Sequence, residues 1–242
     1  MDAIREELVT SLRSTIGEEK NLFAETPEHC RQITVRKPIL NNDDMQRIKQ
    51  SELPGIKSWT INIHYDPNEE NPIQKAMDRV RKEASKAVND GYSILVLSDK
   101  GTDRDNAPIP SLLATAGIHH HLIREGTRSK IGLAIETGEA REIAHFALLI
   151  GYGAAVINPY LALSTVEMQI ASQSTFANLS PSTAVKNYLE ASHKGILKIM
   201  SKMGISAIQS YRGAQIFEAV GLSETVIGEY FTGTPSRIGG IN

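Results

Sequence analysis

The sequence predicts an α/β protein in which repeated strand–helix units build a parallel sheet resembling part of a (β/α) barrel. Three observations predict this class. Short apolar segments alternate with segments whose apolar residues recur at helical spacing. One strand segment, residues 92–99, is apolar almost throughout, as in parallel strands buried on both faces. Asn, Asp, Gly and Pro mark the junctions between segments.

A charged and irregular N-terminal segment precedes these repeats. Residues 2–17 carry apolar residues at helical spacing and end at Gly17, so a helix is predicted there. Residues 23–55 are rich in Pro, Asn and Asp, and regular alternation begins near residue 54. We therefore expect a helical or irregular N-terminal segment over residues 1–53 and a βα-repeat domain over residues 54–242.

The repeats start with an alternating strand at 58–66 and an amphipathic helix at 71–91, where Pro72 suits the first helical turn. The strand at 92–99 follows. The same criteria then predict helices at 110–126, 139–153, 180–204 and 212–221, and strands at 130–138, 154–160 and 205–211. Five units are too few to close a (β/α) barrel, so either the sheet is open or further strands belong to another part of a longer chain.

Polar side chains stand where the predicted strands end. Because the carboxyl ends of parallel strands meet at one edge, these side chains would line a common rim. The rim could bind a small polar ligand, or its members could cap the following helices. A cation at the start of the helix predicted at 212–221 would oppose the helix dipole and need an anionic partner. The residues expected near a ligand or a domain interface are Asp99, Asp103, Arg104, Glu136, Asn158, Ser210 and Arg212.

Three consecutive histidines, His119, His120 and His121, raise the question of a metal site. Neighbouring residues of a helix point in different directions, so the three rings cannot share one metal, and the i, i+4 ligand spacing of H-E-x-x-H is absent. The pair His121 and Glu125 has the spacing of a surface contact. The run is interpreted as one side of a helix, and no metal-binding residue is assigned.

Composition excludes several classes of protein. The net charge of −2 offers no basic surface for nucleic acid, and no run of about 20 apolar residues suggests a membrane span. Nucleophile-elbow, P-loop and dinucleotide-binding motifs are absent. The one cysteine, Cys30, can form neither an internal disulfide nor a cysteine-based metal site. No catalytic or cofactor-binding residue is therefore assigned, and whether the chain is an enzyme stays uncertain.

Long stretches of the sequence resemble one known family. Residues 94–162 ("ILVLSDKGTDRDNAPIPSLLATAGIHHHLIREGTRSK…") and 187–241 ("NYLEASHKGILKIMSKMGISAIQSYRGAQIFEAVG…") are similar to the central region of the glutamate synthase large subunit. The opening "DAIREELVTSL" and the segment "ETPEHCRQITVRKPIL" fit the same family. The resemblance therefore runs from about residue 2 to the end of the sequence.

This resemblance implies a connecting domain, with a fold that is a degenerate relative of a (β/α) barrel. In the family, an amidotransferase domain with an N-terminal cysteine releases ammonia from glutamine, and a tunnel leads the ammonia to a flavin-bearing barrel. There it reacts with 2-oxoglutarate to give glutamate. FMN and an iron–sulfur cluster belong to the full-length protein, with electrons from ferredoxin or a pyridine-nucleotide-oxidising subunit. Both outer domains would lie outside this chain, so no cofactor is expected within it.

Three functions stay open on the sequence alone. The first is a central domain of glutamate synthase with no turnover of its own, whose partners are the amidotransferase and FMN-binding domains of the same parent chain. The second is a free-standing small-molecule enzyme with Asp99, Glu136 and Asn158 as acid, base and anchor. The third is a metal-binding module built from the histidines. Neither a nucleic acid nor a membrane partner is expected, and the compartment is expected to be the cytoplasm, or the plastid stroma in a photosynthetic eukaryote.

Overall fold

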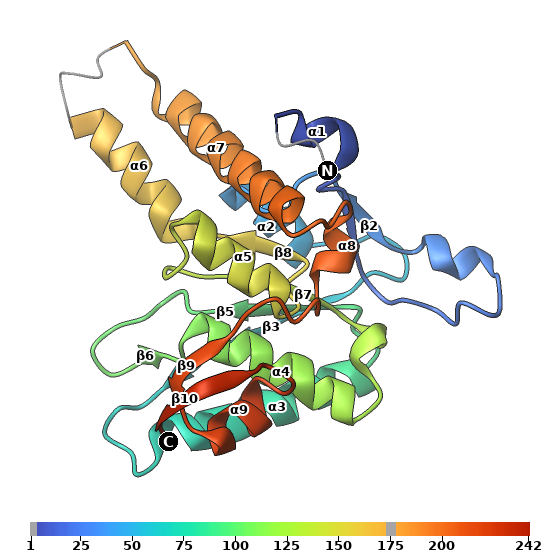
Figure 1. Ribbon diagram of the computed structural model, residues 1–242, viewed down its shortest axis with the longest axis vertical. Coiled ribbons are helices and arrows are strands. Elements are labelled where there is room, and N and C mark those ends of the chain that lie inside the picture. Colours follow the sequence, from blue (N-terminus) through green and yellow to red (C-terminus); the bar gives the residue numbers. More distant parts are fainter. Residues whose placement is uncertain (1–3, 173–177) are drawn as a thin grey trace.

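The computed structural model describes residues 4–172 and 178–242 (Figure 1). At its centre is a parallel sheet in the order β3, β5, β7 and β8. These strands span Ser58–Asn62, Ile94–Ser98, Gly132–Glu136 and Val156–Asn158. The order across the sheet follows the order along the chain, as in part of a (β/α) barrel. The predicted α/β class with a parallel βα-repeat sheet is confirmed.

Helices cover one face of this sheet. Side chains on this face, among them Leu95, Leu97, Leu133 and Ile135, form one buried cluster with apolar residues of the helices. Burying each such side chain stabilises the fold by about 1.5–3 kcal/mol. The helices are α3 (Pro72–Asn89), α4 (Ser111–Arg124), α5 (Ile143–Gly151) and α7 (Pro181–Lys202).

The other face of the sheet is covered by the predicted N-terminal segment. Ile94, Val96, Ala134 and Val156 on this face form a second buried cluster. A closed barrel would enclose this face, and here residues before β3 bury it instead. They come from β1 (Ser14–Ile16), β2 (Ile33–Val35), α2 (Asn42–Lys49) and the connection between β2 and α2, and include Ile16, Val35, Leu40, Met45 and Ile48.

The chain reaches α2 by running alongside β8. Ile157 donates its backbone N–H to Pro38 O at 2.8 Å, and Leu40 donates its N–H to Ile157 O at 2.8 Å. Asn41 then caps α2, because its side-chain oxygen accepts from the Asp44 N–H at 2.8 Å. This path places the last turn of α2 over the carboxyl ends of the strands.

Over the described residues 4–17, the helix predicted at 2–17 is wrong except for α1 (Glu6–Val9), and residues 2 and 3 lie outside the described residues. Residues 14–16 form β1, which pairs antiparallel with β2. Leu12, Ser14 and Ile16 are buried while Ser11 and Arg13 are exposed. That alternation has the two-residue period of a strand, whereas the prediction used the 3.6-residue period of a helix. Burial of Ile16 against the sheet favours the strand.

The fifth predicted strand–helix unit is also wrong. Residues 208–211 form a short helix, α8 (Ile208–Tyr211), which buries Ile208 and Tyr211 one turn apart. The helix predicted at 212–221 is absent because Gly213 and Gly221 have positive φ angles of 71° and 79°, which an α-helix does not allow. The chain instead continues into β9 (Ala219–Leu222), α9 (Glu224–Tyr230) and β10 (Ser236–Ile241), with β9 and β10 paired in parallel.

Three smaller differences complete the fold. The strand predicted at 58–66 divides after β3, and β4 (His64–Tyr65) pairs with β6 (Ala107–Pro108) outside the main sheet. An unpredicted helix, α6 (Tyr160–Ser172), follows β8 and packs beside α7 (Figure 1). The described residues include two 3₁₀ turns, η1 (Pro27–Cys30) and η2 (Arg128–Lys130). Within the described ranges, no helix has both the length and the apolar character needed to span a bilayer.

Candidate functional site

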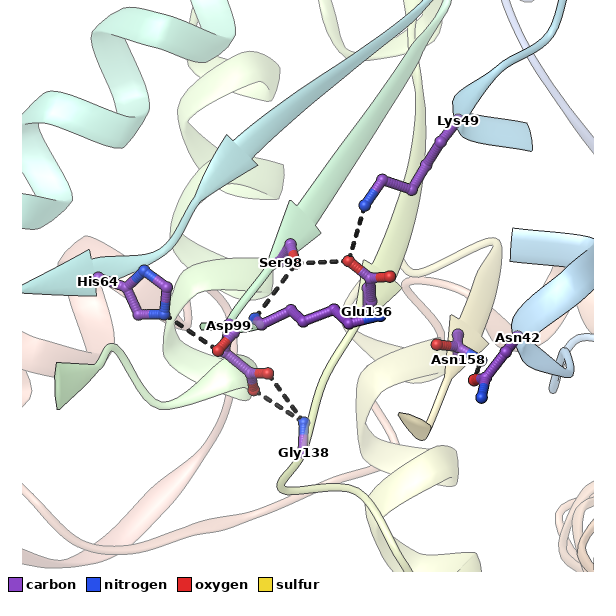
Figure 2. Close-up of polar contacts among 9 residues, drawn as sticks. Asn42, Lys49, His64, Ser98, Asp99, Glu136, Gly138 and Asn158 are labelled. Atoms are coloured by element: carbon purple, nitrogen blue, oxygen red, sulfur yellow. Dashed lines mark hydrogen bonds and ion pairs between the residues drawn. The ribbon is translucent and has the colours of Figure 1, made fainter. Parts of the chain in front are cut away.

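Three neighbouring strands of the main sheet end in buried polar residues, as the sequence predicts. Ser98, Glu136 and Asn158 lie side by side in the register of β5, β7 and β8, and Asp99 and Thr137 each come one residue later. All five are at most 2% exposed. We call these five residues the carboxyl edge, and Figure 2 labels all of them except Thr137.

Glu136 is the most buried carboxylate of this edge, with 1% of its surface exposed. Lys49 Nζ, at the end of α2, lies 3.0 Å from Glu136 Oε2, and Ser98 Oγ donates to the same oxygen at 2.5 Å (Figure 2). Removing a carboxylate from water is costly unless it is paired and hydrogen-bonded. Within the same chain, Lys49 supplies the ion pair and Ser98 the hydrogen bond that offset this cost.

Asp99 points away from Glu136 into the turn after β7 (Figure 2). Its carboxylate accepts from Thr137 Oγ1 at 2.6 Å and from the Gly138 N–H at 2.9 and 3.0 Å. Burial raises the pKa of Asp99, while hydrogen bonds from Thr137, Gly138 and Tyr160 oppose that shift. The His64 ring donates from Nε2 to Asp99 O at 3.0 Å, so main chain and side chain are both held.

Asn158 is the member of the carboxyl edge that contacts the start of α2 in the N-terminal segment. Its side-chain amide donates to Leu40 O at 3.1 Å and to Asn42 Oδ1 at 3.0 Å. Leu40 and Asn42 flank the cap of α2, so this contact fixes the start of that helix while Lys49 fixes its end. The polar strand ends thus bind a segment of the same chain.

The other four predicted rim residues do not join this edge. Asp103 and Arg104 lie exposed in the loop between β5 and β6, where Asp103 accepts from the Asn106 and Asp105 N–H groups at 2.9 Å. Hydrogen bonds from Asn106 lower the pKa of Asp103. Ser210 is exposed on α8, and Arg212 follows α8 close to Gly132, at the amino end of β7. Arg212 therefore stands at the end of a helix and not at the start of one.

The three histidines of α4 have different neighbours. His119 Nδ1 accepts from Arg128 Nε at 2.9 Å, and the His119 and His120 rings meet edge to face, 5.1 Å between centroids. His121 Nε2 lies 2.8 Å from Ser85 Oγ and 3.4 Å from the Glu125 carboxylate. This is no catalytic triad, because in a triad the acid holds the ring nitrogen that does not face the serine.

The donor chemistry of the described residues fits neither a metal nor the cofactors of the full-length family. No three His, Cys, Asp or Glu side chains in the described ranges are grouped to hold a metal ion. An iron–sulfur cluster needs several thiolates, and Cys30 stands alone and exposed. The carboxyl edge would repel a flavin phosphate, because the carboxylates of Asp99 and Glu136 line it and accept hydrogen bonds from this chain.

The sequence does not reveal the partners that fill this edge. Lys49 and Asn42 lie 87 and 116 residues before their partners Glu136 and Asn158, on a helix with no motif that marks them. Ser98 and Thr137 directly adjoin predicted rim positions and follow the same strand-end rule. That adjacency is the signal by which they could have been found.

Known proteins resemble this chain over its full length. A model of the glutamate synthase central domain family matches residues 1–223. The NADPH-type glutamate synthase large chain of Bacillus subtilis (strain 168) is 44% identical over 242 residues, which cover 100% of this chain and 16% of that protein. Ferredoxin-dependent glutamate synthase 2 of Synechocystis sp. is 39% identical, again over 100% of this chain and 16% of the relative. Among solved structures, a flavocytochrome b2 variant with benzoylformate has a TM-score of 0.48 and 14% identity, over 75% of this chain and 45% of that chain.

The chain therefore spans about one sixth of the curated relatives it matches. Relatives named for two different electron donors align with all of it, so the match does not depend on one type of enzyme. The family model covers both the N-terminal segment and the repeats. On this evidence the chain belongs to the glutamate synthase central domain family.

Proposed function

We propose that the chain serves as a connecting domain of a glutamate synthase large chain and does not itself catalyse a reaction. The observation that carries this proposal is the closed carboxyl edge. Glu136, Asp99 and Asn158 are buried, and each is hydrogen-bonded to groups of the same chain, so each already holds a part of this chain. In (β/α) enzymes that edge carries the active site.

The parent protein would make L-glutamate from L-glutamine and 2-oxoglutarate. Its amidotransferase and FMN-binding domains would be the partners of this chain, and FMN and the iron–sulfur cluster would be held there. The donor would be ferredoxin or a pyridine-nucleotide-oxidising subunit, since relatives of both kinds are similar to this chain. We place the protein in the cytoplasm or a plastid stroma, and we keep residues 1–53 and 54–242 as its two structural parts.

A rigid connector has a chemical purpose in such a reaction. Ammonia that escapes into water at neutral pH becomes ammonium, which is not a nucleophile. Two distant active sites therefore need a fixed separation and sealed walls between them. Two buried clusters on opposite faces of one sheet, joined by the N-terminal segment, support this role.

The proposal can be tested by exchanging segments. Because this chain aligns over its full length with the B. subtilis large chain, it can replace the matching segment there. We expect the hybrid to consume about one glutamine per 2-oxoglutarate converted, because coupled turnover makes one glutamate from each of them. A hybrid that folds and converts 2-oxoglutarate but hydrolyses glutamine in excess of it would argue against the connecting role.

The free-standing enzyme is separated from the connector by Glu136→Gln, with Glu70→Gln as a matched control on an exposed carboxylate. If Glu136 is structural, its replacement lowers the melting temperature of the hybrid, while the rate of glutamate formation per folded hybrid molecule stays unchanged. If Glu136 is a base, turnover is lost without loss of stability. The purified chain alone should be colourless and without glutaminase activity, and a yellow, flavin-loaded preparation would contradict the proposal.

A further inference from the structure

A second polar site lies at the amino edge of the main sheet, opposite the carboxyl edge. It is a pocket of about 590 Å³ between the turn after β1, the end of α4, the starts of β7 and β8, and α8. Its charged and titratable lining groups are Glu19, His119, Arg128 and Arg212. We call it the Arg128–Arg212 pocket.

Arg128 is fixed in the wall of this pocket by neutral acceptors. Its Nε donates to His119 Nδ1 at 2.9 Å, Nη1 to Ile131 O at 2.6 Å, and Nη2 to Gly153 O at 3.0 Å. Burial, and then the Arg128 charge, lowers the pKa of His119 to about 3, so the ring is neutral and accepts at Nδ1. None of these contacts neutralises the guanidinium. Burial and the nearby Arg212 charge lower the pKa of Arg128 to about 10, so it remains a cation at neutral pH.

Arg212 is held far more loosely. In the part of the chain that the structure describes, its guanidinium makes one hydrogen bond, from Nη2 to Ser14 Oγ at 3.3 Å. A guanidinium carries five N–H donors arranged as a planar fork. Arg212 is half-buried and lines the pocket, and its other N–H donors have no acceptor among the described residues.

The charge of the pocket is not balanced from within. Neither Arg128 nor Arg212 forms an ion pair with a carboxylate of the described residues. Glu19, the one acidic lining residue, is exposed, and its charge opposes the lowering of the pKa of both arginines. Two cations therefore face one carboxylate that contacts neither. Partly buried like charges cost free energy unless an anion joins them.

We propose that the Arg128–Arg212 pocket binds a small free oxyanion, a carboxylate or a phosphate group. The open fork of Arg212 would bind it, since guanidinium geometry matches both groups. Arg128 adds a fixed positive charge behind the ligand, because three of its five N–H donors hold it in the wall. Glu19 lies beside them as a competing negative charge.

Isothermal titration calorimetry on the purified chain tests this with inorganic phosphate and with succinate, each against sodium chloride at equal ionic strength. We expect saturable one-to-one binding of at least one anion, and the tighter of the two identifies the preferred chemistry. Arg212→Gln should weaken that binding at least tenfold. Arg104→Gln, an exposed arginine in the loop between β5 and β6, should change it less than twofold.

A further variant tests the site without disturbing the arginines. Glu19→Gln removes a negative charge from the pocket and should tighten binding several-fold. Far-UV circular dichroism and melting temperature establish that each variant is folded. Absence of saturable binding of both anions would overturn the proposal, as would equal affinity in folded Arg212→Gln. If Arg212→Gln does not fold, Arg212→Lys keeps the charge without the fork, and unchanged affinity there, or unchanged affinity in Glu19→Gln, would also refute it.

Discussion

The ion pair between Lys49 and Glu136 allows the closed carboxyl edge to be tested by a single substitution. Lys49→Met removes the cation but keeps most of the aliphatic length of the side chain. Glu136, 1% exposed, would then keep only the hydrogen bond from Ser98. Breaking a buried ion pair by removing one partner costs about 3–5 kcal/mol. Because the Lys49 side chain is 21% exposed and partly screened by water, we expect the lower end, about 3 kcal/mol.

Urea denaturation followed by far-UV circular dichroism measures this loss as a lower free energy of unfolding. For a chain of this size, about 3 kcal/mol corresponds to a melting temperature lower by about 6–12 °C. The matched control is Lys86→Met. Lys86 pairs with Asp90 at 3.1 Å, but its side chain is 75% exposed, and such surface pairs contribute only about 0.3–0.5 kcal/mol.

A double variant separates the charge effect from lost packing. Glu136→Gln removes the carboxylate charge but keeps an oxygen that can accept from Ser98. Adding it to Lys49→Met should therefore restore about 2 kcal/mol, because the unpaired buried charge is gone. The reasoning is refuted if Lys49→Met is no more destabilising than Lys86→Met, or if the double variant is simply the sum of two losses.

A buried histidine, two glycines and an exposed thiol give three more measurable outcomes. Burial lowers the pKa of His193 from 6.5 to about 4, so between these pH values the unfolded chain binds a proton that the folded chain does not. The free energy of unfolding should therefore fall as pH drops from about 6.5 to about 4, by at most about 1.4 kcal/mol per pH unit from this group. His193→Gln should lessen that slope in urea titrations at several pH values, and an unchanged slope would contradict the assignment. Gly153→Ala would put a Cβ 2.4 Å from His119 Nδ1 at a φ of +111°, so we expect it to lower the free energy of unfolding by about 2–5 kcal/mol. The control Gly126→Ala, where no atom lies near the added Cβ, should lower it by about 1–2 kcal/mol, and equal losses in urea would show that the His119 contact is unimportant. Cys30 is exposed and should react with Ellman's reagent at one equivalent per chain without denaturant, whereas a need for urea would show that it is covered.

Much of the main sheet is predictable from local sequence. The apolar runs of β5, β7 and β8 are bounded by turn residues, and each run is followed directly by polar residues. Asp99, Glu136 and Asn158 were therefore expected on one edge, and the register places them there. Strand ends are visible in sequence because a buried strand must end where polar residues begin.

The failures of prediction share a physical cause. In β1, the spacing of apolar residues is compatible with a helix, but the segment forms a strand because this buries Ile16 under the sheet. The fifth unit failed because an apolar run with glycines can form either a strand or a turn, and the positive φ angles of Gly213 and Gly221 follow from tertiary packing. Lys49 was missed for the same reason. A lysine at the end of a polar helix looks exposed until the fold brings a carboxylate to it.

The direction of each side chain along β5 explains why this edge is closed. Leu95 and Leu97 face the helices, whereas Ile94, Val96 and Ser98 face the N-terminal segment. By register, Glu136 and Asn158 share the face of Ser98. In a complete barrel that face points into the barrel, and polar strand ends at its mouth are free to act on a ligand. Here the segment before β3 fills the same space, and its Lys49 and Asn42 bind those polar ends. The feature that provides an active site in barrel enzymes therefore anchors the N-terminal segment in this chain, which supports the proposed connecting role.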